Sequence, residues 1–113
     1  MAAVVTSIAT SIGGETTQQR WNRLANAWQI FTRIAMDAAD AEARARGYVK
    51  QAAGLCGRMC GPAVMRAYAN AVDTHNTLRA QSRDAQQRAD AVYHEMMLAH
   101  GAYLDEMRRR GAT

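Results

Sequence analysis

The chain is 113 residues long and holds 14 basic and 10 acidic residues, for a formal net charge of +4. This length accommodates one small domain with one core. Although 49% of the residues are hydrophobic, alanine supplies a large share of them, so we expect a thin core that favours association. The mild basic excess excludes a dedicated nucleic-acid packing protein. No apolar run reaches the ~18 residues of a membrane-spanning helix, so we expect no membrane span.

Residues 1–14, MAAVVTSIATSIGG, are apolar and carry no charged side chain. They lack the positive region of a secretory signal peptide. Their Ser, Thr and Ile content is similar to that of the unstructured export signals of type III secretion substrates. We therefore expect the protein in the cytoplasm, or exported without a cleaved signal peptide as part of an assembly. The segment is predicted to be a flexible or partner-docked N-terminal arm, with Val4, Val5, Ile8 and Ile12 as its anchors.

A capping box formed by Thr16 and Gln19 predicts the start of a first long helix, which we expect to reach about Ala52. The acid-first pair Glu42 and Arg46 indicates a solvated outer surface on this helix. A second row of residues, Trp21, Trp28, Ala35 and Val49, is expected to widen the apolar face to one side. The main apolar stripe, with steps of three and four residues, is predicted to be Leu24, Ala27, Phe31, Ile34, Ala38, Ala41, Ala45, Tyr48 and Ala52.

A second long helix is predicted from Pro62, which suits the first helical position, to about Arg109. Arg108 to Arg110 complement the negative end of the helix dipole, and Gly111 is a plausible C-cap. The apolar stripe of this helix has the same spacing and comprises Val64, Tyr68, Ala71, His75, Leu78, Ser82, Ala85, Ala89, Val92, Met96, Ala99 and Tyr103.

The stretch GLCGRMCGP, residues 54–62, separates the two predicted helices, and its glycines supply the backbone freedom that a reversal needs. The predicted fold class is therefore all-α. Two long antiparallel helices form a coiled-coil-like helical hairpin over residues 15–113, with the turn near 53–62 and the arm at 1–14.

The two cysteines, Cys56 and Cys60, do not complete a metal site. Their C-x3-C spacing supplies two ligands, whereas structural zinc takes four. Thiolate and thioether ligands suit Cu(I), so a site with Met59 is an alternative. Small buried hydrophobic residues in a turn are the preferred interpretation. His94 and His100 lie on different sides of a helix and do not converge. We expect no metal and no cofactor.

No nucleophile elbow, phosphate loop or metalloprotease motif is present, so we expect no catalytic residue and no enzymatic activity. His75 and Ser82 are instead polar residues within the apolar stripe. Polar residues in such a seam typically fix helix register or partner choice. We assign them this role.

A partner interface is predicted from the large residues that a two-helix hairpin can only half cover. The alternative is that Met96, Met97 and Leu104 close over the tryptophans within one chain. A basic cluster around the turn is a second candidate surface, for phosphates or acidic partners, and comprises Arg44, Arg46, Lys50, Arg58 and Arg66. The predicted partner-interface residues are Trp21, Leu24, Trp28, Phe31, Met96, Met97 and Tyr103.

In general architecture, such a hairpin is similar to type III secretion needle, rod and chaperone proteins, to type VII secretion hairpins and to phage assembly proteins. It departs from the needle group in lacking a proline-rich turn, and from the type VII group in lacking W-x-G at the turn. The leading hypothesis is a non-enzymatic assembly protein that oligomerises or packs on a helical partner, such as a subunit of a secretion apparatus or phage-like particle. The alternatives are a small chaperone or adaptor for a helical protein, and a basic nucleic-acid-binding helical protein.

Overall fold

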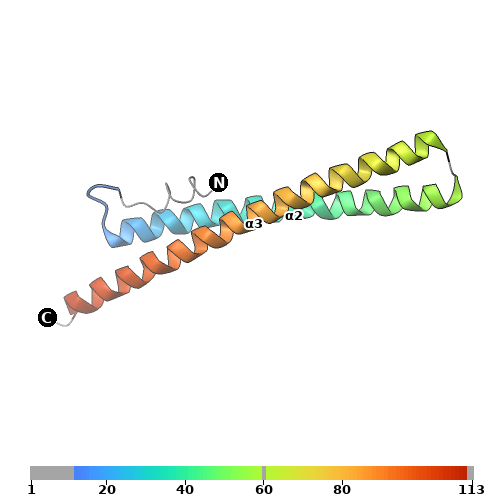
Figure 1. Ribbon diagram of the computed structural model, residues 1–113. Coiled ribbons are helices and arrows are strands. Elements are labelled where there is room, and N and C mark those ends of the chain that lie inside the picture. The colour runs from blue at the N-terminus through green and yellow to red at the C-terminus, as the bar shows by residue number, and fades with distance from the viewer. Residues whose placement is uncertain (1–11, 60, 112–113) are drawn as a thin grey trace. The chain divides into compact units, whose positions relative to one another are not determined.

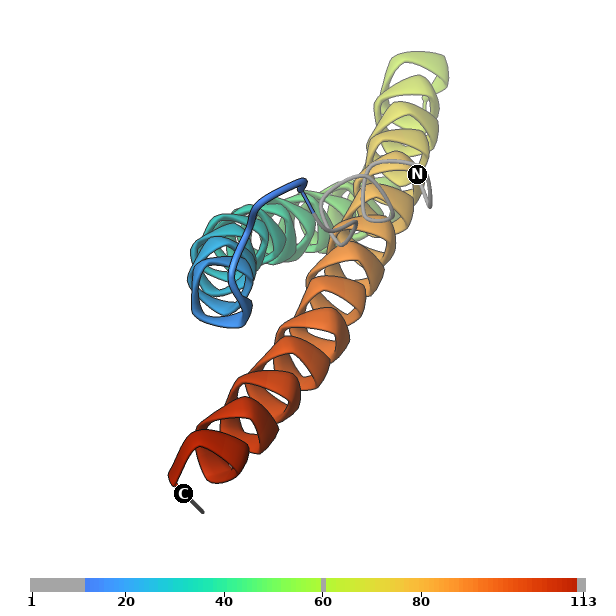
Figure 2. The same ribbon diagram turned by 90° about the vertical axis from the view of Figure 1, so that its left-hand side faces the viewer.

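Two long helices make up the secondary structure in a computed structural model that describes residues 12–59 and 61–111. Helix α2 spans Thr17–Arg58 and helix α3 spans Pro62–Gly111, and none of the described residues lies in a strand (Figures 1 and 2). The predicted all-α helical hairpin is confirmed. The predicted arm anchors Val4, Val5 and Ile8, together with Cys60, lie outside the described residues.

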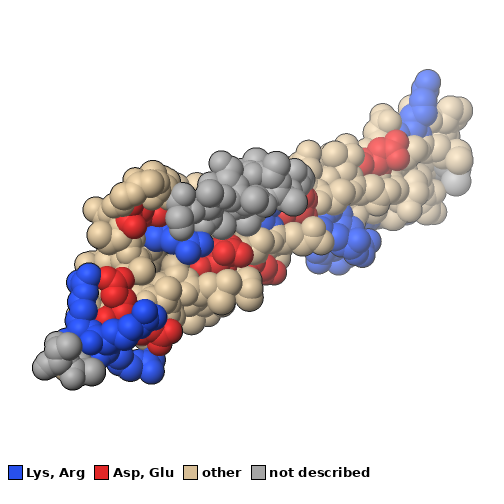
Figure 3. Space-filling view, turned by 60° about the vertical axis from the view of Figure 1, so that its left-hand side comes forward, with Lys and Arg blue, Asp and Glu red and all other residues tan. Residues whose placement is uncertain are grey.

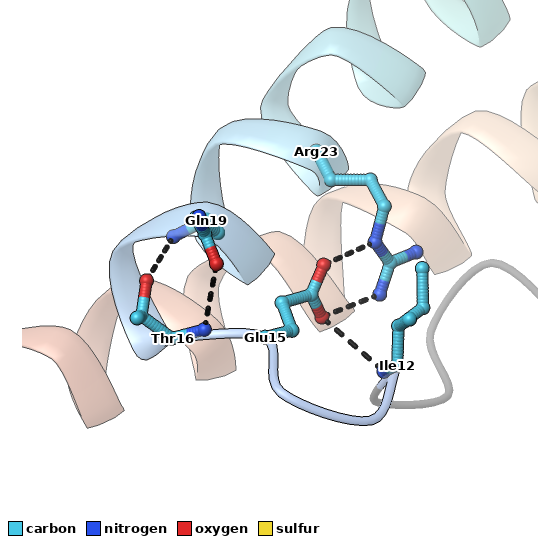
Figure 4. A network of polar contacts seen from close by, with 5 residues as sticks. All are labelled: Ile12, Glu15, Thr16, Gln19 and Arg23. Atoms are coloured by element: carbon cyan, nitrogen blue, oxygen red, sulfur yellow. Dashed lines mark hydrogen bonds and ion pairs between the residues drawn. The ribbon is translucent and has the colours of Figure 1, made fainter.

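The start of α2 is fixed by the predicted capping box. The backbone N–H of Gln19 donates to Thr16 Oγ1 at 3.1 Å, and the backbone N–H of Thr16 donates to Gln19 Oε1 at 2.9 Å (Figure 4). Two backbone donors that the helix itself cannot satisfy are thereby paired. Thr16 is the cap, and α2 begins at the next residue.

The end of α2 lies further along the chain than expected, at Arg58 rather than near Ala52. Gly54 and Gly57 are helical residues, and the backbone N–H of Met59 still donates to the carbonyl of Leu55 at 2.7 Å. Glycine lowers helix propensity but does not by itself end a helix. The break between the helices is confined to residues 59–61, which is shorter than the predicted turn at 53–62.

The chain divides into two compact units, each containing part of both helices. Unit 1 holds the described residues up to Arg33 and from Gln86 onward, and unit 2 is Ile34–Ala85. In unit 1 the core consists of Leu24, Met96 and Ala99, against which Trp21, Ala25 and Trp28 pack. In unit 2 the buried hydrophobic side chains are the alanines Ala35, Ala45 and Ala85.

The buried face of α2 differs by one row from the predicted stripe. Ile34 and Tyr48, placed on the main stripe by the sequence, are 51% and 63% exposed. The row that we assigned to the side of the stripe is instead part of the seam, because it carries the two tryptophans and therefore more apolar volume. The seam of α2 is Thr17, Trp21, Leu24, Trp28, Phe31, Ala35, Ala38, Glu42, Ala45, Val49, Ala52 and Cys56, all buried or half-buried.

The predicted seam of α3 is confirmed along most of its length. From Ala71 to Tyr103 every residue of the predicted stripe is buried or half-buried. Tyr68, which lies nearer the turn, is exposed. Strict three-four spacing in both helices is the pattern of a coiled-coil seam.

Candidate interaction surface

An aromatic cluster in unit 1 contains three of the seven predicted partner-interface residues, Trp21, Trp28 and Tyr103. The ring of Trp21 lies 4.5 Å from that of His100 and 5.4 Å from that of Tyr103, centroid to centroid. The ring of Trp28 lies 5.6 Å from that of Tyr93 at an interplanar angle of 50°. These are the separations at which aromatic pairs stabilise a fold beyond the area they bury.

The other predicted interface residues divide between the core and the surface. Leu24 is fully buried and Met96 is buried beside it, so both serve the core of unit 1. Phe31 is half-buried, whereas Met97 is exposed. Met96 therefore packs with the tryptophans in the core, and Met97 and Leu104 remain on the surface.

A second apolar row on α3 flanks the seam of unit 1. Its members are spaced by four, seven and three residues, which places them on one side of the helix. His100 falls within the same row, and its ring contacts that of Trp21 at an interplanar angle of 32°. We name as the α3 stripe the four large side chains of this row, which are 40% to 47% exposed: Tyr93, Met97, Leu104 and Met107.

Only Met97 of the α3 stripe was predicted as an interface residue. The signal for the others is the same three-four alternation, displaced by one residue from the seam positions Val92, Met96, Ala99 and Tyr103. The sequence pattern of one helix reveals two apolar rows, but only the packed structure shows which row is buried against the other helix.

The polar seam residue His75 has a partner in unit 2 that sequence reasoning missed. Its Nε2 lies 2.8 Å from Glu42 Oε1, and the second carboxylate oxygen accepts from Arg46 Nη2. The hydrogen bond from His75, and then the one from Arg46, hold the pKa of Glu42 below its ordinary value. Both partners of the cross-helix pair are largely covered, since less than a fifth of either side chain is exposed.

Glu42 had been assigned to the solvated outer surface because it forms an acid-first pair with Arg46. That ion pair is present. Glu42 nevertheless stands seven residues after Ala35 and seven before Val49, which is the seam row. Ser82, the other predicted register residue, is also a half-buried seam residue of unit 2. A polar seam pair favours the alignment in which its two members meet.

The predicted basic cluster does not converge on one side of α2. All five members are exposed, but positions 44 and 58 lie on one side of the helix and positions 46 and 50 on nearly the opposite side. Figure 3 shows basic and acidic side chains interleaved on the face it presents. The four basic residues on α2, Arg44, Arg46, Lys50 and Arg58, therefore form no continuous track along one side of that helix.

An open hollow in unit 2 is a candidate small-ligand site among the described residues. It measures about 200 Å³ and is lined by Ala45, Tyr48, Asn70, Ala71 and Thr74. Ligand pockets usually exceed about 300 Å³.

Among the described side chains, no group of three His, Cys, Asp or Glu residues could hold a metal ion. No helix within residues 12–59 and 61–111 is long and apolar enough to cross a membrane.

Comparison of the chain with protein-family models, curated proteins and solved structures finds no match.

Proposed function

We propose that the protein is a non-enzymatic helical assembly subunit that associates with copies of itself through the α3 stripe of unit 1. The observation that carries the proposal is the alignment of Tyr93, Met97, Leu104 and Met107 along one flank of α3, each 40% to 47% exposed. Exposed apolar side chains scattered singly are ordinary on a protein surface, whereas an aligned row is typical of helix-to-helix packing.

The thin core of the chain supports the same proposal. Five of the eight buried hydrophobic residues within the described part are alanines, which bury little area each. Covering the exposed halves of the four stripe side chains would add about 3–6 kcal/mol per chain, at 1.5–3 kcal/mol for each fully buried large side chain. Before the entropy cost of association, that gain reaches the lower end of the about 5–15 kcal/mol that stabilises a whole domain.

The kind of assembly that we propose is the one expected from the sequence, a subunit of a secretion apparatus or phage-like particle. A small chaperone or adaptor is the second candidate, because a stripe on one flank of one helix also fits a single amphipathic helix of a different protein. The third hypothesis, nucleic-acid binding, receives no support from the divided basic residues.

The proposal is tested by a matched pair of leucines on α3. Leu104 belongs to the stripe, whereas Leu98 is at least as exposed but lies on another side of the helix. We expect Leu104→Gln to weaken self-association about tenfold and Leu98→Gln to leave it unchanged, because only the former removes apolar area from the stripe. Sedimentation equilibrium over a range of concentrations gives both dissociation constants, and circular dichroism verifies that both variants stay helical.

Two results would contradict self-assembly through the stripe. A wild-type chain that is monomeric at every concentration would exclude homo-oligomerisation and leave the adaptor hypothesis standing. Equal weakening by the Leu98→Gln and Leu104→Gln variants would show that association does not use the α3 stripe.

A further inference from the structure

We infer that residues 1–11 dock on their own chain, against the face of α2 that carries Ala27 and Ile30. The inference is independent of the proposed function, because it concerns a different face of unit 1.

A tight turn at Ile12–Glu15 reverses the chain immediately before the helix. The backbone N–H of Glu15 donates to the carbonyl of Ile12 at 2.9 Å, and Gly14 has a φ of 78°. These features fit a type II turn, in which the third residue takes a positive φ that glycine tolerates best. The side chain of Glu15 also accepts from the backbone N–H of Ile12 at 3.5 Å.

Arg23 attaches this turn to the side of α2. Its Nε donates to Glu15 Oε2 at 2.8 Å and its Nη2 donates to Glu15 Oε1 at 3.1 Å (Figure 4). Only 8% of the Glu15 side chain is exposed. The bidentate geometry is the strongest arrangement for this type of ion pair. Ile12 is consequently held beside the second turn of α2.

The face next to this clamp carries two apolar side chains, of which Ala27 is half-buried and Ile30 is exposed. Arg23, Ala27 and Ile30 are spaced by four and three residues, so they lie on one side of α2. Ile30 is 61% exposed and Ile12 is 58% exposed. Trp28 lies on the other side of Leu24 from this face, so the aromatic cluster does not cover Ile30.

Residues 1–11 match this face in length and chemistry. From Arg23 to Ile30 the helix advances about 10 Å, whereas eleven residues span about 16 Å as a helix and up to about 36 Å extended. They contain Val4, Val5 and Ile8 and no charged side chain, so docking desolvates no side-chain charge. The short tether gives the segment an effective concentration in the millimolar range, which favours its own chain over a second copy.

Disulfide trapping tests the docking directly. In a Cys56→Ser, Cys60→Ser background, each of Val4→Cys, Val5→Cys and Ile8→Cys is combined with Ile30→Cys. The matched control replaces Ile30→Cys by Gln29→Cys, an exposed position about 100° around the helix. Under a mild oxidant at low protein concentration, intact mass and non-reducing gels follow disulfide formation.

We expect at least one arm position to form an intrachain disulfide with position 30 at least about tenfold faster than with position 29. Adding Gly14→Ala, which is strained at a φ of 78°, should reduce that rate because it disturbs the turn.

Rates that do not differ between positions 29 and 30 for all three arm positions would overturn the inference. So would a disulfide that forms between chains when the single variants Ile8→Cys and Ile30→Cys are mixed but does not form within one chain. The latter result would mean that the segment docks on a second copy. Neither outcome depends on the α3 stripe.

Discussion

Units 1 and 2 have the same helical spacing but fill it with different side chains. The seam of unit 1 contains Leu24 and Val92, both fully buried, together with two tryptophans. The seam of unit 2 contains buried alanines and the hydrogen-bonded pair Glu42 and His75. Heptad spacing alone therefore does not determine how much stability each part of the hairpin contributes.

The difference separates two contributions to a helical hairpin. Large side chains in unit 1 remove most of the apolar area from water and stabilise the packed state without strong preference for one alignment. A half-covered polar pair in unit 2 adds little net stability, but an alignment that separates Glu42 from His75 leaves polar groups without their partner. We infer that unit 1 supplies stability and unit 2 supplies register.

The largest expected effect is the loss of a core side chain from unit 1. Leu24→Ala should lower the free energy of unfolding by about 2–5 kcal/mol, because Leu24 is fully buried against Met96 and Ala99. In unit 2, Ala71→Leu should instead raise it by about 1 kcal/mol, because Ala71 lines the open hollow. Urea denaturation monitored by circular dichroism measures both changes.

Tryptophan fluorescence sharpens this test, because both tryptophans are in unit 1. Ala35→Gly is the comparison substitution in the seam of unit 2, and it should lower the free energy of unfolding by about 1 kcal/mol. If Leu24→Ala lowers that free energy by less than Ala35→Gly does, the stability does not reside mainly in unit 1.

A smaller effect is expected from acid. Hydrogen bonds from His75 and then from Arg46 lower the pKa of Glu42 below the ordinary value of 4.5. A lowered pKa in the folded state means that this stabilisation is complete above pH ~4.5 and is lost as the pH falls through the folded-state pKa. Glu42→Gln should therefore destabilise the protein at neutral pH and flatten the acid limb of its stability curve, as measured by thermal unfolding between about pH 3 and 7.

Glu15→Gln is the matched variant for unit 1, because Arg23 lowers the pKa of Glu15 in the same direction. Its acid limb should flatten too, but the register of unit 2 should not change. Parallel stability curves for the wild-type and Glu42→Gln proteins across the acid range would refute a role for this carboxylate in holding unit 2.

Local signals allowed the fold to be predicted from the sequence. The Thr16 and Gln19 capping box and Pro62 at the start of α3 act over three or four residues, so the helix starts could be located without any tertiary contact. The end of α2 could not be located in this way. Gly54 and Gly57 suggested a turn, but the helical hydrogen bonds continue to Met59 and override the weak local preference.

The seam of α2 was misplaced by one row because a single helix carries two candidate apolar rows. The row with Ile34 and Tyr48 looks more apolar in the sequence than the row with Glu42. Packing selected the latter, because its tryptophans fill unit 1 and because His75 gives the carboxylate a partner. Which of the two apolar rows becomes buried depends on the side chains of the facing helix. The sequence of one helix alone does not contain that information.

The smallest expected effect concerns the cysteines, which were predicted to be dispensable. Cys56 is a half-buried seam residue of unit 2 whose Sγ donates to the carbonyl of Val64 at 3.7 Å. A serine hydroxyl can donate to the same carbonyl from nearly the same place, so Cys56→Ser with Cys60→Ser should change the free energy of unfolding by less than about 1 kcal/mol. Urea denaturation of the double variant and elemental analysis of the purified wild-type protein measure stability and bound metal. If the wild type carries a stoichiometric metal that the variant loses as it unfolds, the cysteines hold a metal site, and the seam of unit 2 is stabilised by more than alanine packing and the Glu42–His75 pair.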